Sequence, residues 1–104
     1  MTIQFNTDNN VQVHEGFGNK LNAMLTKELN RFAEQLTRLE VHLSDENGHK
    51  PGPEDKKCLI EARIKNKQPV AVTANGANYE IAVKNASDKL KRSLDTVFGR
   101  MQSH

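Results

Sequence analysis

The segment from Asn78 to Met101 constrains the fold of this chain most, because it has the pattern of one long amphipathic helix. Its apolar residues recur at steps of three and four, the period of a single helix face, and they are Tyr79, Val83, Ala86, Leu90, Leu94, Val97 and Met101. Asn78 is predicted to be the N-cap, because its side-chain oxygen can accept a hydrogen bond from a free first-turn N–H. One side of the helix is therefore expected to close a core.

The remaining sides of this helix carry basic residues. Lys84 and Lys91 fall on one flank of the apolar stripe. Lys89 and Arg100 fall on the other flank, and Arg92 points nearly opposite the stripe. The exposed part of the helix is thus predicted to form a cationic surface.

The rest of the chain predicts four strands and a second helix. Alternating apolar and polar residues are typical of half-buried strands, and this pattern covers residues 2–6, 37–44, 57–65 and 70–74. Two polar segments interrupt the pattern, a turn at 7–10 and a proline- and glycine-containing loop at 45–55. Between the turn and the helix, Val11 and Val13 alternate once more.

The other helix is expected from about residue 15 to residue 35, with one apolar face made by Phe17, Leu21, Leu25, Phe32 and Leu36. Lys20, Lys27 and Arg31 are spaced so that they form one row beside that face. Two interpretations of the row remain open. It is either a solvated flank of the helix or a row of cations that follows phosphate groups.

The order strand, helix, three strands, helix predicts a two-layer α/β (α+β) sandwich. Three strands have a polar outer face, so both helices should cover the same face of a four-stranded sheet. The first strand–helix–strand unit should cross over right-handed and pair its strands in parallel. The remaining strands should form an antiparallel meander, and residues 1–104 should form a single domain.

Length, charge and hydropathy limit the classes of function that the chain can have. A chain of 104 residues supports one modest core, and fifteen basic against thirteen acidic residues give a net charge of +2, which permits nucleic-acid binding without requiring it. No apolar run is long enough to cross a bilayer and no signal peptide is evident, so a cytoplasmic protein without membrane contact is expected.

No motif predicts an enzyme, a metal site or a cofactor. Gly16-x-Gly18 lacks the third glycine of a dinucleotide fingerprint. The Asp45–Gly48 segment resembles a calcium loop, but Lys56 stands where a bidentate Glu belongs. Cys58 is the only cysteine, and its alternation with apolar residues predicts a buried thiol rather than a nucleophile.

The aromatic residues argue against base recognition. The chain has four phenylalanines, one tyrosine and no tryptophan, and Phe5, Phe17 and Phe32 are assigned to the core. A base-stacking platform is therefore not expected. If the protein binds nucleic acid, it should contact phosphates and shape, which suits folded RNA.

The segment Asp88-Lys89-Leu90-Lys91-Arg92-Ser93-Leu94 resembles the D-K-L-x-R-Q-L segment in the last helix of the ribosome hibernation-promoting factor and ribosome-associated inhibitor family. Val11-Gln12-Val13-His14-Glu15 is similar to the family's V-x-I-T-E segment before the first helix. The order of strands and helices is also that of the family. The chain departs from the pattern at residues 77–82, where the family has D-M-Y-A-A-I.

This resemblance implies a translation inhibitor that lodges in the mRNA–tRNA channel of the small ribosomal subunit and keeps ribosomes idle. Its partners would be that subunit and its rRNA, with no small-molecule substrate and no dimerisation domain of its own. Lys89 and Arg92 match basic family positions, and Lys27 and Arg31 match approximately. The complete set of candidate RNA-binding residues is Lys84, Lys89, Lys91, Arg92, Lys20, Lys27 and Arg31.

Two alternatives use the same fold. A protein-interaction module would dock through the open sheet face and depend on Arg38, His42, Arg63 and Lys65. A double-stranded RNA-binding module is disfavoured, because the last helix lacks a lysine cluster at its N-terminus.

Overall fold

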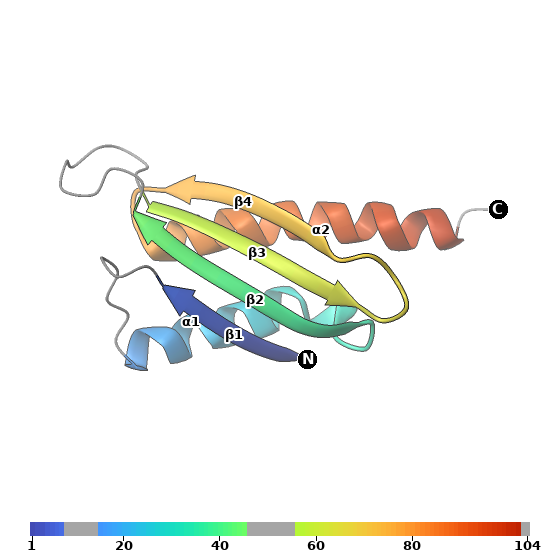
Figure 1. The fold of residues 1–104 in the computed structure, drawn as a ribbon, viewed down its shortest axis with the longest axis horizontal. Helices are drawn as coiled ribbons and strands as arrows, with labels where there is room; N and C mark the ends of the chain where they lie inside the picture. The colour runs from blue at the N-terminus through green and yellow to red at the C-terminus, as the bar shows by residue number, and fades with distance from the viewer. Residues whose placement is uncertain (8–14, 46–55, 103–104) are drawn as a thin grey trace.

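The computed structural model describes residues 1–7, 15–45 and 56–102, and it describes side chains up to residue 99. The elements are β1 (Thr2–Thr7), α1 (Glu15–Glu28), the 3-10 helix η1 (Asn30–Phe32), β2 (Leu36–Asp45), β3 (Lys56–Ile64), β4 (Val70–Gly76) and α2 (Tyr79–Gln102). Residues 8–10 of the predicted turn, the alternation of Val11 and Val13, and residues 46–55 of the predicted loop lie outside the described residues. Thr7 and Asp45, predicted in the turn and the loop, are instead the last residues of β1 and β2. Figure 1 shows the strands as one sheet with both helices behind it.

The sheet has the predicted topology. Its strand order is β1-β2-β3-β4, with β1 parallel to β2 and the other neighbours antiparallel. The register aligns core-facing positions across the strands: Val41 of β2 lies opposite Phe5 on one side and Ile60 on the other. The two-layer α/β sandwich expected from the order of elements is confirmed.

The core fills the space between the sheet and the two helices. α1 contributes Leu21 and Leu25, which have no solvent exposure. Every second residue of β2 and β3 faces the helices, as the alternation predicts, and these buried residues are Leu39, Val41, Leu43, Cys58, Ile60, Ala62 and Ile64. The apolar stripe of α2 is buried at Val83, Ala86, Leu90 and Leu94. Burial of this continuous apolar surface is the main favourable contribution to folding.

α2 begins as its sequence predicts. The backbone N–H of Ile81 donates to the Oδ1 atom of Asn78 at 2.8 Å, which makes Asn78 the N-cap. Just before it, a Cβ atom on Gly76 would lie 2.6 Å from the backbone nitrogen of Ala82. Only glycine therefore allows the end of β4 and the first turn of α2 to approach so closely.

The prediction of one helix over residues 15–35 is wrong at its C-terminal end. α1 ends at Glu28, and the chain tightens into η1, where the N–H of Phe32 donates to the carbonyl of Leu29 at 2.9 Å. The tighter turn still buries Phe32 and lets the chain begin β2 at Leu36. Tertiary packing thus overrides the helical periodicity of residues 29–35. It also means that Arg31 does not continue the row of Lys20 and Lys27 on one α-helix.

Candidate nucleic-acid interface

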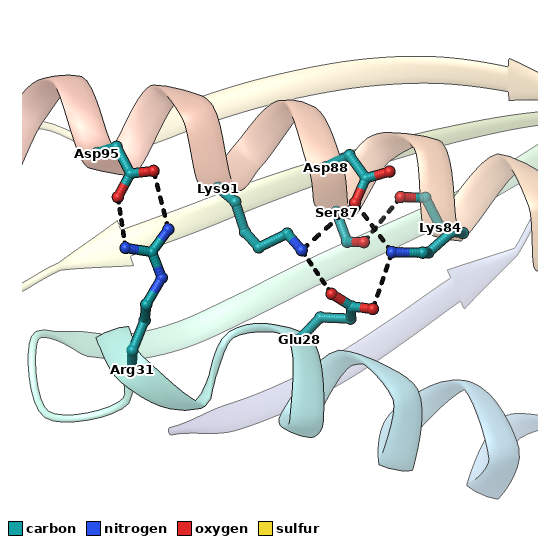
Figure 2. Close-up of polar contacts among 7 residues, drawn as sticks. All are labelled: Glu28, Arg31, Lys84, Ser87, Asp88, Lys91 and Asp95. Atoms are coloured by element: carbon teal, nitrogen blue, oxygen red, sulfur yellow. Dashed lines mark hydrogen bonds and ion pairs between the residues drawn. The ribbon is translucent and has the colours of Figure 1, made fainter.

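The candidate cations of both helices lie on the helical layer, and a carboxylate on α1 joins two of them. Glu28, in the last turn of α1, contacts Lys84 at 2.9 Å and Lys91 at 2.6 Å through its two carboxylate oxygens. Asp88 lies 3.0 Å from Lys84 and 3.4 Å from Lys91 on α2 itself. Figure 2 shows these four side chains as one network between the two helices.

This network shifts the pKa values of Glu28, Asp88 and Lys84. Hydrogen bonds from Lys91, which has the larger effect, and from Lys84 lower the pKa of Glu28 from 4.5 to about 2. The hydrogen bond from Lys84 likewise lowers the pKa of Asp88, and the hydrogen bond to Glu28 raises the pKa of Lys84. Two lysines and two carboxylates carry no net formal charge together. The flank that the sequence presents as cationic is therefore electrically balanced.

Two further candidate cations form exposed ion pairs between elements. Lys20 on α1 lies 3.1 Å from Glu80 in the first turn of α2. Arg31 on η1 contacts both oxygens of Asp95, with nitrogen–oxygen distances of 2.7 and 2.8 Å (Figure 2). These side chains are about half exposed or more, so each pair contributes little to stability. Breaking either pair would consequently cost the fold little.

Lys89 lies on the opposite flank of α2, against the edge of the sheet. Its Nζ atom donates to the carbonyl of Thr73 at 2.8 Å, while the amide of Asn85 donates to the carbonyl of Asn75 at 3.0 Å. These bonds satisfy carbonyls of the edge strand β4, which would otherwise be open to pairing with another chain. Lys89 and Arg92 also line a shallow hollow of about 420 Å³.

Arg92 and Lys27 are exposed and form no ion pair within residues 1–7, 15–45 and 56–99. The structure therefore separates the seven predicted RNA-binding residues into small groups. Lys84 and Lys91 share Glu28, Lys89 and Arg92 share a hollow, and Lys20, Lys27 and Arg31 lie at separate points along the first helical segment.

The open sheet face carries a balanced ion network. Glu40 lies 3.4 Å from Arg38 and 3.5 Å from Arg63, and Arg63 also pairs with Glu61 at 3.0 Å. Arg38 additionally donates a hydrogen bond to Gln4 on β1. Of the other two residues in the protein-interaction alternative, His42 is exposed in β2, whereas Lys65 lies in the β3–β4 turn instead of the predicted strand.

The acidic partners are the functional-site residues that the sequence analysis missed. The Lys84–Asp88 pair has the i, i+4 spacing of a helical ion pair, so the sequence contains its signal. Glu28 is 56 residues from Lys84, and Asp95 is 64 residues from Arg31. No local pattern reveals such pairs, because only the packing of α1 and η1 beside α2 creates them.

The remaining expectations concern the Cys58 thiol, metal ligands and membrane-spanning helices. Cys58 is fully buried, as predicted, and burial raises its thiol pKa to about 12. Within the part of the chain that the structure describes, no three His, Cys, Asp or Glu side chains gather where they could hold a metal ion. None of the described helices is both long and apolar enough to cross a membrane.

Two solved structures have a similar fold. The N-terminal domain of protein Y from Thermus thermophilus matches with a TM-score of 0.66 and 14% sequence identity, covering 92% of this chain and 94% of that chain. A ribosomal subunit interface protein from Coxiella burnetii matches with a TM-score of 0.67 and 16% identity, covering 95% and 99%. At these identities the likeness shows the shared fold alone.

No curated protein sequence matches the chain significantly. The family model described as sigma 54 modulation protein / S30EA ribosomal protein matches residues 3–102, which is nearly the whole sequence. The chain therefore belongs to the sigma 54 modulation protein / S30EA ribosomal protein family, in agreement with its sequence resemblance to hibernation-promoting factors.

Proposed function

We propose that this protein binds the small ribosomal subunit in the mRNA–tRNA channel and keeps ribosomes idle by occupying it. Family membership indicates a ribosome-associated modulation or hibernation factor. The channel as the binding site and the rRNA as the ligand are the proposed details. The supporting observation is the set of cations along α1, η1 and α2, several of which are exposed or paired only through exposed carboxylates.

Recognition would rest on phosphates rather than on base edges. Lys27 and Arg92 are available as they stand, while Lys20 and Arg31 would exchange Glu80 and Asp95 for phosphate oxygens. Each phosphate contact releases counterions from RNA, so binding should weaken steeply as salt rises. Because the net charge is only +2, shape complementarity with the channel must contribute as well.

The test is co-sedimentation of the purified protein with ribosomes and separated subunits at low and moderate salt. We expect saturable association with the small subunit that is lost when messenger RNA and initiator transfer RNA are loaded first. Association with the large subunit alone, or association unaffected by that loading, would contradict the channel site.

A matched pair of variants tests which surface binds. Lys89→Gln with Arg92→Gln removes two positive charges from α2, and we expect weaker ribosome binding by a folded protein. Lys57→Gln with Arg63→Gln removes two positive charges from β3, which forms part of the open sheet face, and binding should persist. The reverse result would favour docking through the open sheet face.

A further inference from the structure

A hollow of about 530 Å³ lies where η1, the β3–β4 turn and the C-terminal half of α2 meet. Figure 1 places these three segments at the same end of the molecule. The volume falls within the range of small-molecule binding sites. The lining combines rings, cations and an amide, from Phe32, Phe98, Arg31, Lys65, Lys67 and Gln35.

Planar groups are layered along one wall of this hollow. The rings of Phe32 and Phe98 stack with centroids 5.9 Å apart and planes at 23°. The guanidinium carbon of Arg31 lies 4.4 Å from the centroid of the Phe32 ring, and Asp95 fixes that guanidinium by two contacts. Phe32 is buried, whereas Phe98 is partly exposed. Phe98 therefore offers aromatic surface that the core does not cover, and the core assignments made from the sequence did not include it.

Cations occupy another side of the hollow. The N–H of Lys65 donates to the carbonyl of Gln35 at 2.9 Å, which holds the β3–β4 turn beside the segment before β2. Asn66 has φ of 60°, the left-handed conformation of a tight turn, so Lys65 and Lys67 flank a sharp reversal of the chain. Both lysines are exposed and form no ion pair with any residue that the structure describes. Unlike Lys84 and Lys91, they have no carboxylate within ion-pair distance among the described residues.

Gly99 keeps the α2 wall of the hollow free of a side chain. A Cβ atom built there would meet nothing within 4 Å, so packing does not require glycine at this position. Glycine inside a helix nevertheless lowers helix stability relative to alanine. Gly99 therefore lines the hollow with backbone atoms alone.

We propose that this hollow binds a nucleoside phosphate, with the base stacked on the exposed part of the Phe98 ring and the phosphate beside Lys65 and Lys67. The Arg31–Asp95 pair carries no net formal charge, whereas Lys65 and Lys67 carry two positive charges, which favours this orientation over its reverse. The ligand is either a free mononucleotide or an unstacked nucleotide of RNA. The RNA form rests on the proposed ribosomal function, whereas the free form does not.

The test is titration of the ¹⁵N-labelled full chain, followed by amide chemical shifts. The probes are the four ribonucleoside 5′-monophosphates, inorganic phosphate and a mixed-sequence single-stranded oligoribonucleotide. We expect saturable shifts at Gln35, Lys65–Lys67, Phe98 and Gly99. Shifts with mononucleotides identify free nucleotide as the source, and shifts only with the oligoribonucleotide identify RNA.

Variants separate stacking from charge. Phe98→Leu removes the ring and should weaken binding about tenfold, within the range for loss of a base–aromatic stack. Gly99→Leu fills the hollow with a better helix former and should weaken binding as much. Lys67→Gln should weaken binding, whereas Lys57→Gln on β3, outside the hollow, should not.

Three results would overturn the proposal: no shifts at the hollow with any nucleotide probe, shifts reproduced by phosphate alone, or unchanged affinity in both Phe98→Leu and Gly99→Leu. Ribosome co-sedimentation keeps the two proposals distinguishable. A wild-type protein that fails to bind ribosomes but gives the mononucleotide shifts overturns the ribosomal function and supports the hollow. A protein that binds ribosomes but gives no shift at the hollow supports the ribosomal function and overturns the proposed nucleotide site.

Discussion

Glu28 on α1 forms ion pairs with two lysines of α2. Its carboxylate accepts hydrogen bonds from Lys84 and Lys91, and these bonds hold its pKa near 2 instead of 4.5. Because the folded-state pKa lies below the unfolded one, the ionised form is favoured by folding. The resulting stability is present above about pH 4.5 and is lost as the pH falls from there toward 2.

We therefore expect Glu28→Gln to lower the free energy of unfolding by about 1 kcal/mol at neutral pH, the upper range for exposed ion pairs. The deficit should shrink as the pH falls below 4.5, since the wild type then loses the same interaction. Urea denaturation at several pH values measures this. Glu34→Gln removes an exposed carboxylate that forms no ion pair among the described residues, so it serves as the control. A pH-independent deficit in Glu28→Gln would contradict the assignment.

Gly76 and Gly99 provide opposite tests of packing at single residues. Gly76→Ala places Cβ within 3 Å of α2 backbone and should lower the free energy of unfolding by about 1–3 kcal/mol. Gly99→Ala meets nothing within 4 Å and should raise it by about 0.5–1 kcal/mol. Thermal unfolding of both variants gives the comparison, and equal effects would show that the close approach at Gly76 does not constrain the fold.

At the scale of elements, α2 contacts both the sheet and the other helix. Its apolar stripe covers the sheet, one flank reaches α1 through Lys84 and Lys91, and the other reaches the β4 edge through Lys89. Any loss of helix in the first half of α2 would therefore disturb its packing on the sheet and its ion pairs with α1. The N-cap at Asn78 fixes where this helix begins.

Asn78→Ala should accordingly lower the free energy of unfolding by about 1 kcal/mol, because a first-turn N–H loses its acceptor. Asn78→Asp should retain most of the stability, since it keeps the acceptor and adds a charge that the helix dipole favours. Denaturant unfolding measures both variants, with Asn19→Ala on the exposed side of α1 as a control. An Asn78→Asp variant as unstable as Asn78→Ala would show that the cap bond is not the cause.

At the scale of the whole molecule, charge balance would limit the RNA affinity that we propose. Glu28 and Asp88 neutralise the two lysines that they contact, so a phosphate must compete with protein carboxylates for Lys84 and Lys91. The formal net charge of +2 does not show which lysines are paired with carboxylates. Two proteins of equal net charge would have different RNA affinities if the carboxylates lay beside the RNA-binding lysines in one and away from them in the other.

We expect Glu28→Gln to bind the small subunit more tightly at low salt, because it removes one of the two carboxylates that neutralise Lys84 and Lys91 and raises the net charge from +2 by one. A plot of log affinity against log salt should steepen by up to about 0.7–0.9 for each additional phosphate that the variant neutralises. Glu61→Gln makes the same charge change on β3, in the ion network of the open sheet face, and should have a smaller effect. Equal increases in affinity in the two variants would indicate a response to net charge and not to the helical layer.

Local sequence patterns were sufficient to predict the fold. Alternation in β2 and β3 placed Leu39, Val41 and Ile60 in the core, because a strand with one buried face needs that period. The three-and-four spacing of Val83, Leu90 and other apolar residues likewise defined the buried stripe of α2. The order of elements then left few ways to cover a sheet with two helices.

Apart from the local pairs that Asp88 makes with Lys84 and Lys91 along α2, the tertiary structure decided which cations are paired. The sequence contains the same seven basic residues, but whether each is free depends on partners up to 64 residues away, such as Asp95 for Arg31. The tertiary structure also decided that α1 ends at Glu28, which brings that carboxylate to Lys84 and Lys91. Periodicity reports which face of an element is buried, because burial repeats along the chain. Ion pairs between elements have no such repeat, so they follow only from how the elements pack.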